Sequence, residues 1–156
     1  MQAMEILKRC RNAENEIIRI ESQIRRRRDL LGQTGAPAMD PNRGGRGSSD
    51  PDKTGRILGD IDLLERALEA RKQRKAVEEA ASIALTEMAP ELEGKVLYRY
   101  YVKRDTVAGI ARKEKYTEGY IRKVRKRGEE IMRLLSPEKV ATTVPRWYIE
   151  ERRVNG

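Results

Sequence analysis

The sequence predicts an all-α protein in which a long helical hairpin with a flexible loop precedes a compact helix-turn-helix module. Apolar residues recur at steps of three and four over two long segments, and residues 32–55 between them are rich in glycine and proline. Residues 90–136 contain closely spaced helix-capping residues and a tight turn. We therefore predict a coiled-coil-like oligomerisation hairpin at 1–89, a flexible linker at 32–55 within it, a helix-turn-helix at 90–136 and a tail at 137–156.

The amino-acid composition limits the classes of function that this protein can have. Hydrophobic and charged residues each make up 38% of the 156 residues, which is more typical of a helical interaction protein than of an enzyme with a deep cavity. The absence of histidine and the single cysteine exclude histidine general-base chemistry, zinc-finger spacing and an intramolecular disulfide. No apolar run has the length of a signal peptide or a membrane span. We expect a non-enzymatic cytoplasmic protein with no cofactor, no metal and no membrane contact.

The first helix is predicted from apolar or small residues at heptad spacing. These are Ile6, Cys10, Ala13, Ile17, Ile20 and Ile24. Because Cys10 lies in this series, we expect a small buried side chain and not a reactive thiol. The arginine run at residues 25–28 follows. Residues 1–94 carry 17 basic and 17 acidic residues, so we interpret this run as a solvated helix end and not as a nucleic-acid contact.

A second long helix is predicted after the linker, which holds six glycines and three prolines. Its apolar positions are Ile57, Ile61, Leu64 and Leu68, followed by a weaker series at Val77, Ala80, Ala84 and Met88. The helix should end before Pro90. Because one polar helix pair buries little apolar area by itself, we expect chains to associate, most simply as a homodimer.

The module begins with "KVLYRYYV" at residues 95–102, which predicts a helix because Leu92, Val96 and Tyr100 repeat at four. At this spacing, tyrosines are more often core residues than base-stacking platforms. This interpretation applies to Tyr98, Tyr100, Tyr101 and Tyr116. Asp105 is expected to cap a short helix at residues 106–114, and Thr117 a longer helix that ends near Leu135.

The turn "KEKYT" between these helices completes helix-turn-helix spacing. Ala111 should face inward, Tyr116 should be buried, and Ile121 and Val124 should supply the apolar pair of the second helix. Lys115 occupies a turn position where glycine is common. A positive φ there would cost some stability, and a turn of a different shape is the alternative.

The net positive charge is confined to this module. Residues 95–127 carry 12 basic and 3 acidic residues, which accounts for the whole net charge of +9. At ~100° per residue, the helix after Thr117 should bury one stripe. The stripe comprises Tyr120, Ile121, Val124, Gly128, Ile131 and Leu135. The exposed face should then be basic across its whole width, as a surface for phosphate would be.

This face fits a DNA major groove. Gly119 has no side chain to hold the backbone away, and Arg122 and Lys126 are placed to reach base edges. Lys123, Arg125 and Arg127 are placed to reach phosphates on either side. The simpler alternative is a basic but merely solvated helix face.

Residues 93–135 resemble the helix-turn-helix of sigma-factor region 4, with Arg99 and Tyr100 from the family pattern L-x-x-R-Y, then Ile110 and Ala111, then a threonine-capped helix. The wider plan is similar to small phage regulators of the ArpU and RinA type. The resemblance implies a phage- or prophage-encoded, sequence-specific double-stranded DNA-binding regulator of late genes in the bacterial cytoplasm. It also implies host RNA polymerase as a possible partner, although the other sigma regions are missing.

The resemblance adds two residues to the predicted site, because promoter-reading residues of region 4 fall on Thr117, Glu118, Arg122 and Lys123. The predicted DNA-binding residues are Thr117, Glu118, Gly119, Arg122, Lys123, Arg125, Lys126 and Arg127. A phage small terminase subunit, which recognises DNA for packaging without being an enzyme, is the alternative. A dimer favours the regulator, and a ring of eight or more subunits favours the terminase.

The tail holds the only tryptophan, Trp147, beside Tyr148. Because tryptophan is large and costly to leave in water, we expect this segment to dock on the module core. A short partner-binding segment is the alternative.

Overall fold

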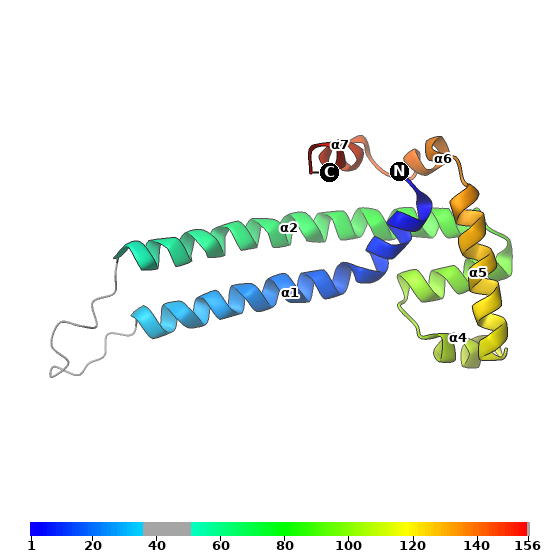
Figure 1. Ribbon diagram of the computed structural model, residues 1–156, viewed down its shortest axis with the longest axis horizontal. Coiled ribbons are helices and arrows are strands. Elements are labelled where there is room, and N and C mark those ends of the chain that lie inside the picture. Colours follow the sequence, from blue (N-terminus) through cyan, green and yellow to red (C-terminus); the bar gives the residue numbers. More distant parts are fainter. Residues whose placement is uncertain (36–50, 156) are drawn as a thin grey trace. The chain divides into compact units, whose positions relative to one another are not determined.

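The computed structural model describes residues 1–35 and 51–155, and every regular element in these ranges is helical, which confirms the all-α prediction (Figure 1). The elements are α1 (Ala3–Gly35), α2 (Pro51–Glu87), α3 (Glu91–Leu97), the π-helical turn η1 (Tyr98–Val102), α4 (Val107–Glu114), α5 (Glu118–Leu134), α6 (Pro137–Ala141) and α7 (Arg146–Asn155). Within the described ranges, no helix is long and apolar enough to cross a membrane.

The chain divides into two compact units. Unit 1 comprises Met1–Ala13 and Gln73–Gly156, and unit 2 comprises Glu14–Lys72. This division differs from the predicted boundary at residue 90, because the start of α1 and the end of α2 supply core side chains to the C-terminal module. The heptad series runs through both units without interruption, so the sequence gives no sign of this boundary.

In unit 2, α1 and α2 form an antiparallel pair (Figure 1). Its buried apolar side chains are Ile17, Ile24, Ile57 and Ile61. Helix α1 continues to Gly35, and α2 begins at Pro51, a residue that suits the first helical turn. Residues 32–35 and 51–55 of the predicted linker are therefore helical, and the remaining part, 36–50, lies outside the described residues.

The predicted seam of α1 is confirmed, since Ile6, Cys10, Ala13, Ile17 and Ile24 are all buried and Ile20 is half-buried. Burial raises the pKa of the Cys10 thiol above its ordinary value, as expected for a buried small side chain.

The second half of the apolar series predicted for α2 is wrong except at Val77, which packs against the larger core of unit 1. Ala80 and Met88 are exposed, and Val77 and Ala84 are only half-buried. The buried stripe is Glu78, Ala81, Ser82, Leu85 and Thr86. These positions have helical spacing, but three of the five side chains are polar, so an apolar pattern does not reveal them.

The larger core of unit 1 gathers residues from both ends of the chain. Its buried members are Ala3, Met4, Ile6, Leu7, Ala81, Leu85, Leu97, Tyr101, Met132, Val140, Val144 and Tyr148. The predicted docking of the tail occurs through Tyr148, which is 1% exposed and donates a 2.7 Å hydrogen bond to Oε1 of Glu78. Trp147, the residue on which that prediction relied, is 40% exposed.

A second, smaller core lies inside the helix-turn-helix. It consists of Val96, Ile110, Ala111, Ile121 and Val124, contributed by α3, α4 and α5. The segment 95–102 is helical as predicted, ending in the π-turn η1, where Tyr101 is buried. Gly128 allows α5 to pack closely on α3, since an added Cβ would lie 2.9 Å from two side-chain carbons of Leu97. These two cores hold α5 in place.

Candidate nucleic-acid interface

Helix α4 is capped by Thr106, whose hydroxyl accepts a 3.1 Å hydrogen bond from the backbone N–H of Gly109. The prediction that Asp105 caps this helix is wrong. Asp105 instead accepts a 3.0 Å hydrogen bond from Nζ of Lys113, near the other end of α4. Thr106 caps the helix because it lies three residues before Gly109, whose backbone N–H has no partner within the helix, and this is the ordinary capping geometry.

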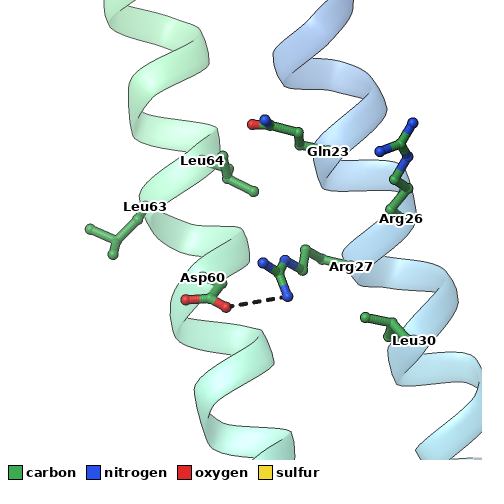
Figure 2. A pocket seen from close by; sticks show the side chains of 7 residues that line it. All are labelled: Gln23, Arg26, Arg27, Leu30, Asp60, Leu63 and Leu64. Atoms are coloured by element: carbon green, nitrogen blue, oxygen red, sulfur yellow. Dashed lines mark ion pairs between the residues drawn. The ribbon is translucent and has the colours of Figure 1, made fainter.

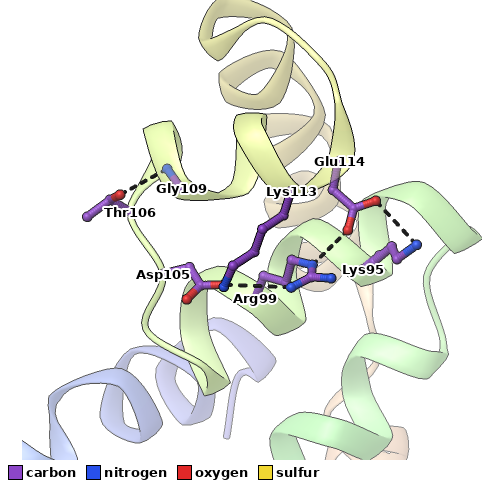
Figure 3. Close-up of polar contacts among 7 residues, drawn as sticks. All are labelled: Lys95, Arg99, Asp105, Thr106, Gly109, Lys113 and Glu114. Atoms are coloured by element: carbon purple, nitrogen blue, oxygen red, sulfur yellow. Dashed lines mark hydrogen bonds and ion pairs between the residues drawn. The ribbon is translucent and has the colours of Figure 1, made fainter.

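Ion pairs connect α4 to the helix before it (Figure 3). Nε of Arg99 donates a 2.7 Å hydrogen bond to Oε1 of Glu114, and Nζ of Lys95 lies 3.2 Å from the other carboxylate oxygen. Arg99 also lies 3.8 Å from Asp105. Glu114 is only 11% exposed at its side chain, so these contacts are screened less than surface pairs are. The network holds α4 against α3 and η1.

The turn between α4 and α5 adopts the first of the two alternatives left open for Lys115. This residue has φ 60° and ψ 43°, the left-handed conformation that usually favours glycine. The backbone N–H of Tyr116 donates to the carbonyl of Ala111 at 3.0 Å. Thr117 caps α5 as predicted, because its hydroxyl accepts a hydrogen bond from the N–H of Tyr120 at 3.2 Å.

The buried stripe of α5 differs in part from the predicted one. Ile121, Val124 and Gly128 are buried as expected, and Met132 is buried in addition. Ile131 and Leu135 are only half-buried. Tyr116 and Tyr120, both predicted to be buried, are 45% and 38% exposed. Ile121 and Met132 belong to the two apolar cores of unit 1, whereas neither tyrosine belongs to them.

Seven of the eight predicted contact residues are exposed side by side on α5 and its cap. They are Thr117, Glu118, Gly119, Arg122, Lys123, Lys126 and Arg127. No atom lies within 4 Å of a Cβ added at Gly119, so the backbone there is open to a ligand. The side chain of Arg122 is 60% exposed, at 3.4 Å from Glu118, and that of Arg127 is 55% exposed, at 3.7 Å from Glu93.

Arg125 occupies a different environment. Its guanidinium lies over the Tyr100 ring at 4.4 Å from the centroid, and its Nε lies 3.5 Å from Glu129. The guanidinium of Arg11 lies over the same ring at 3.8 Å and donates to the Tyr100 carbonyl. With 27% of its side chain exposed, Arg125 faces the packed side of α5. The exposed basic face is therefore narrower than predicted.

Glu129 also accepts a 2.7 Å hydrogen bond from the hydroxyl of Tyr101. Burial, reinforced by this carboxylate, raises the pKa of Tyr101 well above its ordinary range. Tyr101 thus belongs to the structural core and stays neutral. The helix periodicity correctly assigned this tyrosine to the core, whereas the same argument failed for Tyr116 and Tyr120.

The assembled surface offers cations, a capped helix N-terminus and two exposed aromatic rings, a combination that can bind a polyanion and touch base edges. Comparison of the sequence with models of protein families, with curated proteins and with solved structures found no match.

Proposed function

We propose that the protein is a sequence-specific double-stranded DNA-binding transcription regulator that inserts α5 into the major groove. One observation supports this function above others: a capped, well-packed helix-turn-helix exposes Arg122, Lys123, Lys126 and Arg127 on the helix that the motif uses for reading bases. The resemblance of residues 93–135 to sigma-factor region 4 favours the same role, with late genes of a phage or prophage as targets and host RNA polymerase as a further partner.

In the proposed mechanism, the exposed basic side chains of α5 contact different parts of the DNA. Arg122 lies in the second turn of α5 and carries the planar fork that pairs with the O6 and N7 acceptors of guanine. Lys126 and Arg127, one turn further, reach phosphates or a neighbouring base. The pair between Arg122 and Glu118 does not prevent this, because an exposed i,i+4 ion pair is worth only about 0.3 to 0.5 kcal/mol.

Two copies would give the two-fold symmetry that a palindromic site requires. We place their contact on unit 2, whose helix pair leaves Leu58 and Leu63 more than half exposed. A groove of about 560 Å³ lies beside Leu63 and is lined by Leu30, Leu64 and the Arg27–Asp60 pair, among others (Figure 2). Leu63 of one copy is the right kind of side chain to fill that groove on the other, since burial of a leucine stabilises by about 1.5 to 3 kcal/mol.

Association is tested by the solution mass of the full chain and of Leu63→Glu, with Val154→Glu as the control, since Val154 is 85% exposed but lies in unit 1. We expect a dimer that only Leu63→Glu dissociates. A ring of eight or more subunits would instead favour the small terminase, and a monomeric parent chain would contradict the proposed dimer.

DNA binding is tested by selecting bound sequences from random duplex DNA and measuring affinity for the selected site. Arg122→Ala should cost about 1 to 3 kcal/mol on that site and relax the preference at one base position. Arg66→Ala is the matched control, because Arg66 is also an exposed arginine in an i,i+4 pair, but in unit 2. If no sequence is enriched, or if both variants bind like the parent chain, the proposed function is wrong.

A further inference from the structure

Two tyrosines are partly exposed to solvent at the start of α5. The rings of Tyr116 and Tyr120 lie with their centroids 5.0 Å apart at an interplanar angle of 46°. Both rings are outside the two apolar clusters of unit 1, and about two fifths of each residue is exposed. By contrast, Tyr101 and Tyr148 are buried and donate their hydroxyls to carboxylates. The pair is therefore not part of the core.

A local structural role explains only part of this arrangement. Tyr116 immediately precedes the capping residue Thr117, and an apolar residue there commonly packs on the first turn of the helix and fixes the entry of the chain. In that motif the partner is the residue four positions into the helix, here Ile121. Ile121 is fully buried in the helix-turn-helix core, and Tyr116 instead meets the exposed ring of Tyr120.

The pair lies in the part of α5 that would meet base edges. Tyr120 directly follows Gly119, where the helix surface is bare, and precedes Arg122 by two positions. At ~100° per residue, Tyr120 falls on the same edge of α5 as Arg127, and Arg122 falls on the other edge. An apolar ring and a guanidinium thus flank the glycine at the N-terminal end of the helix.

We propose that the Tyr116–Tyr120 pair is a specificity element that contacts the 5-methyl group of a thymine in the major groove, near the base contacted by Arg122. This inference rests on the proposed function. The thymine methyl is the one apolar group that base pairs present in the major groove, and cytosine lacks it. A tyrosine ring covers such a group at low entropic cost because it has only two rotatable side-chain bonds.

The test uses the full chain and the duplex that it selects, with each thymine replaced in turn by deoxyuridine, which removes only the methyl group. We expect at least one replacement to weaken binding about fourfold, the change that corresponds to about 0.8 kcal/mol for one buried carbon group. Tyr120→Ala should weaken binding to the unmodified duplex and abolish this sensitivity. Tyr120→Phe should keep the affinity of the parent chain and its sensitivity to deoxyuridine, because the ring, not the hydroxyl, makes the contact.

Trp147→Ala is the control, since Trp147 is another exposed aromatic residue, located in the tail. It should leave the sensitivity to deoxyuridine unchanged. Thermal unfolding separates a structural role from a reading role: Tyr120→Ala should melt close to the parent chain.

Three outcomes would overturn this inference while leaving the proposed function intact. They are a selected site without thymine, a parent chain indifferent to every deoxyuridine, and a Tyr120→Ala variant that keeps the parent's sensitivity. A Tyr120→Ala variant that melts much earlier and binds all sequences more weakly by the same factor would also overturn it, in favour of a purely structural pair. A parent chain that enriches no sequence at all would instead contradict the proposed function.

Discussion

The two units of this protein are both helical, but they differ in the number of apolar side chains that they bury. In unit 1, 19 apolar side chains are buried, whereas the described residues of unit 2 bury four, Ile17, Ile24, Ile57 and Ile61. Unit 2 carries ion pairs across its two helices, among them Arg28–Glu65 at 2.7 Å and Arg71–Glu16 at 2.5 Å, and unit 1 also has ion pairs, such as Arg99–Glu114. An exposed pair such as Arg28–Glu65 adds little stability compared with a buried apolar core.

This difference is compatible with the roles proposed for the two units. The helix that is proposed to read DNA is set on a dense core, which keeps its exposed side chains in a fixed geometry. The helix pair has a thin core and keeps large apolar side chains such as Leu63 in water. A thin pair that gains stability when its apolar surface is covered is well suited to association.

The largest expected effect comes from matched core truncations in the two units. Leu85→Ala removes a fully buried side chain from unit 1 and should lower the free energy of unfolding by about 2 to 5 kcal/mol. Ile61→Ala removes a side chain from the thinner core of unit 2. The decrease in the free energy of unfolding should be at or below the lower end of that range, because neighbouring side chains can collapse into the space. Urea denaturation followed by circular dichroism gives both values, and hydrogen exchange should show unit 2 opening first. Equal costs and equal protection would contradict the comparison.

The second largest effect is expected at alkaline pH and only in unit 1, which contains all six tyrosines. Burial and the hydrogen bond to Glu78 raise the pKa of Tyr148 from 10 to about 12. The folded state disfavours the tyrosinate. The contribution of Tyr148 to the free energy of unfolding is therefore complete below pH 10 and is lost as the pH rises toward 12. The loss amounts to roughly 2 to 3 kcal/mol for two pKa units.

Melting temperatures measured between pH 9 and 12 should therefore fall steeply in the parent chain and less steeply in Tyr148→Phe. Tyr101, whose pKa is raised further, remains in both proteins and contributes a residual slope. If the two proteins have the same pH profile, Tyr148 does not couple the tail to the stability of unit 1.

Glycine substitutions distinguish the two units at a smaller scale. A Cβ at Gly94 would lie 2.4 Å from the backbone oxygen of Thr86, so Gly94→Ala should destabilise unit 1 by about 1 to 3 kcal/mol. Gly59 lies in the unit 2 part of α2 with no atom within 4 Å of an added Cβ. Gly59→Ala should stabilise by about 0.5 to 1 kcal/mol, since alanine favours a helix over glycine. Opposite signs in thermal unfolding support the comparison, and two neutral results would weaken it.

The sequence predicted what depends on neighbouring residues. Heptad spacing located α1 and the first half of α2, and the position of Thr117 predicted the cap of α5. These features are determined within a turn or two of helix. Of the candidate site, helical periodicity placed five residues correctly on the exposed side, and the resemblance to sigma-factor region 4 added two more, Thr117 and Glu118, that are also exposed.

Features that depend on contacts between distant segments could not be predicted. Glu78 is buried because Tyr148, 70 residues later, donates to it, and no local pattern marks a buried glutamate. Arg125 turns toward Tyr100 and Glu129, so its position on the helix did not reveal its partners. Periodicity assigned Tyr116 and Tyr120 to the core, but it does not show which side chains other segments cover, and both tyrosines are exposed.

The smallest expected effect is the coupling within the Arg28–Glu65 ion pair of unit 2, which is compared with a pair of the same donor–acceptor distance in unit 1. Nη2 of Arg28 lies 2.7 Å from Oε1 of Glu65 in unit 2, and Nε of Arg99 lies 2.7 Å from Oε1 of Glu114 in unit 1. Their side chains are 64% and 48% exposed in the first pair, but 28% and 11% in the second. Solvent should therefore screen the first pair much more strongly.

Double-mutant cycles with alanine at each position measure the coupling within each pair by urea denaturation. We expect about 0.2 to 1 kcal/mol for Arg28–Glu65, as for other exposed pairs, and about 1.5 to 3 kcal/mol for Arg99–Glu114, as for a sheltered charged hydrogen bond. Added salt should reduce the first coupling further and the second only slightly. Equal couplings would mean that ion pairs stabilise unit 2 as much as they stabilise unit 1. The thin apolar core of unit 2 would then no longer be a reason to expect a partner chain.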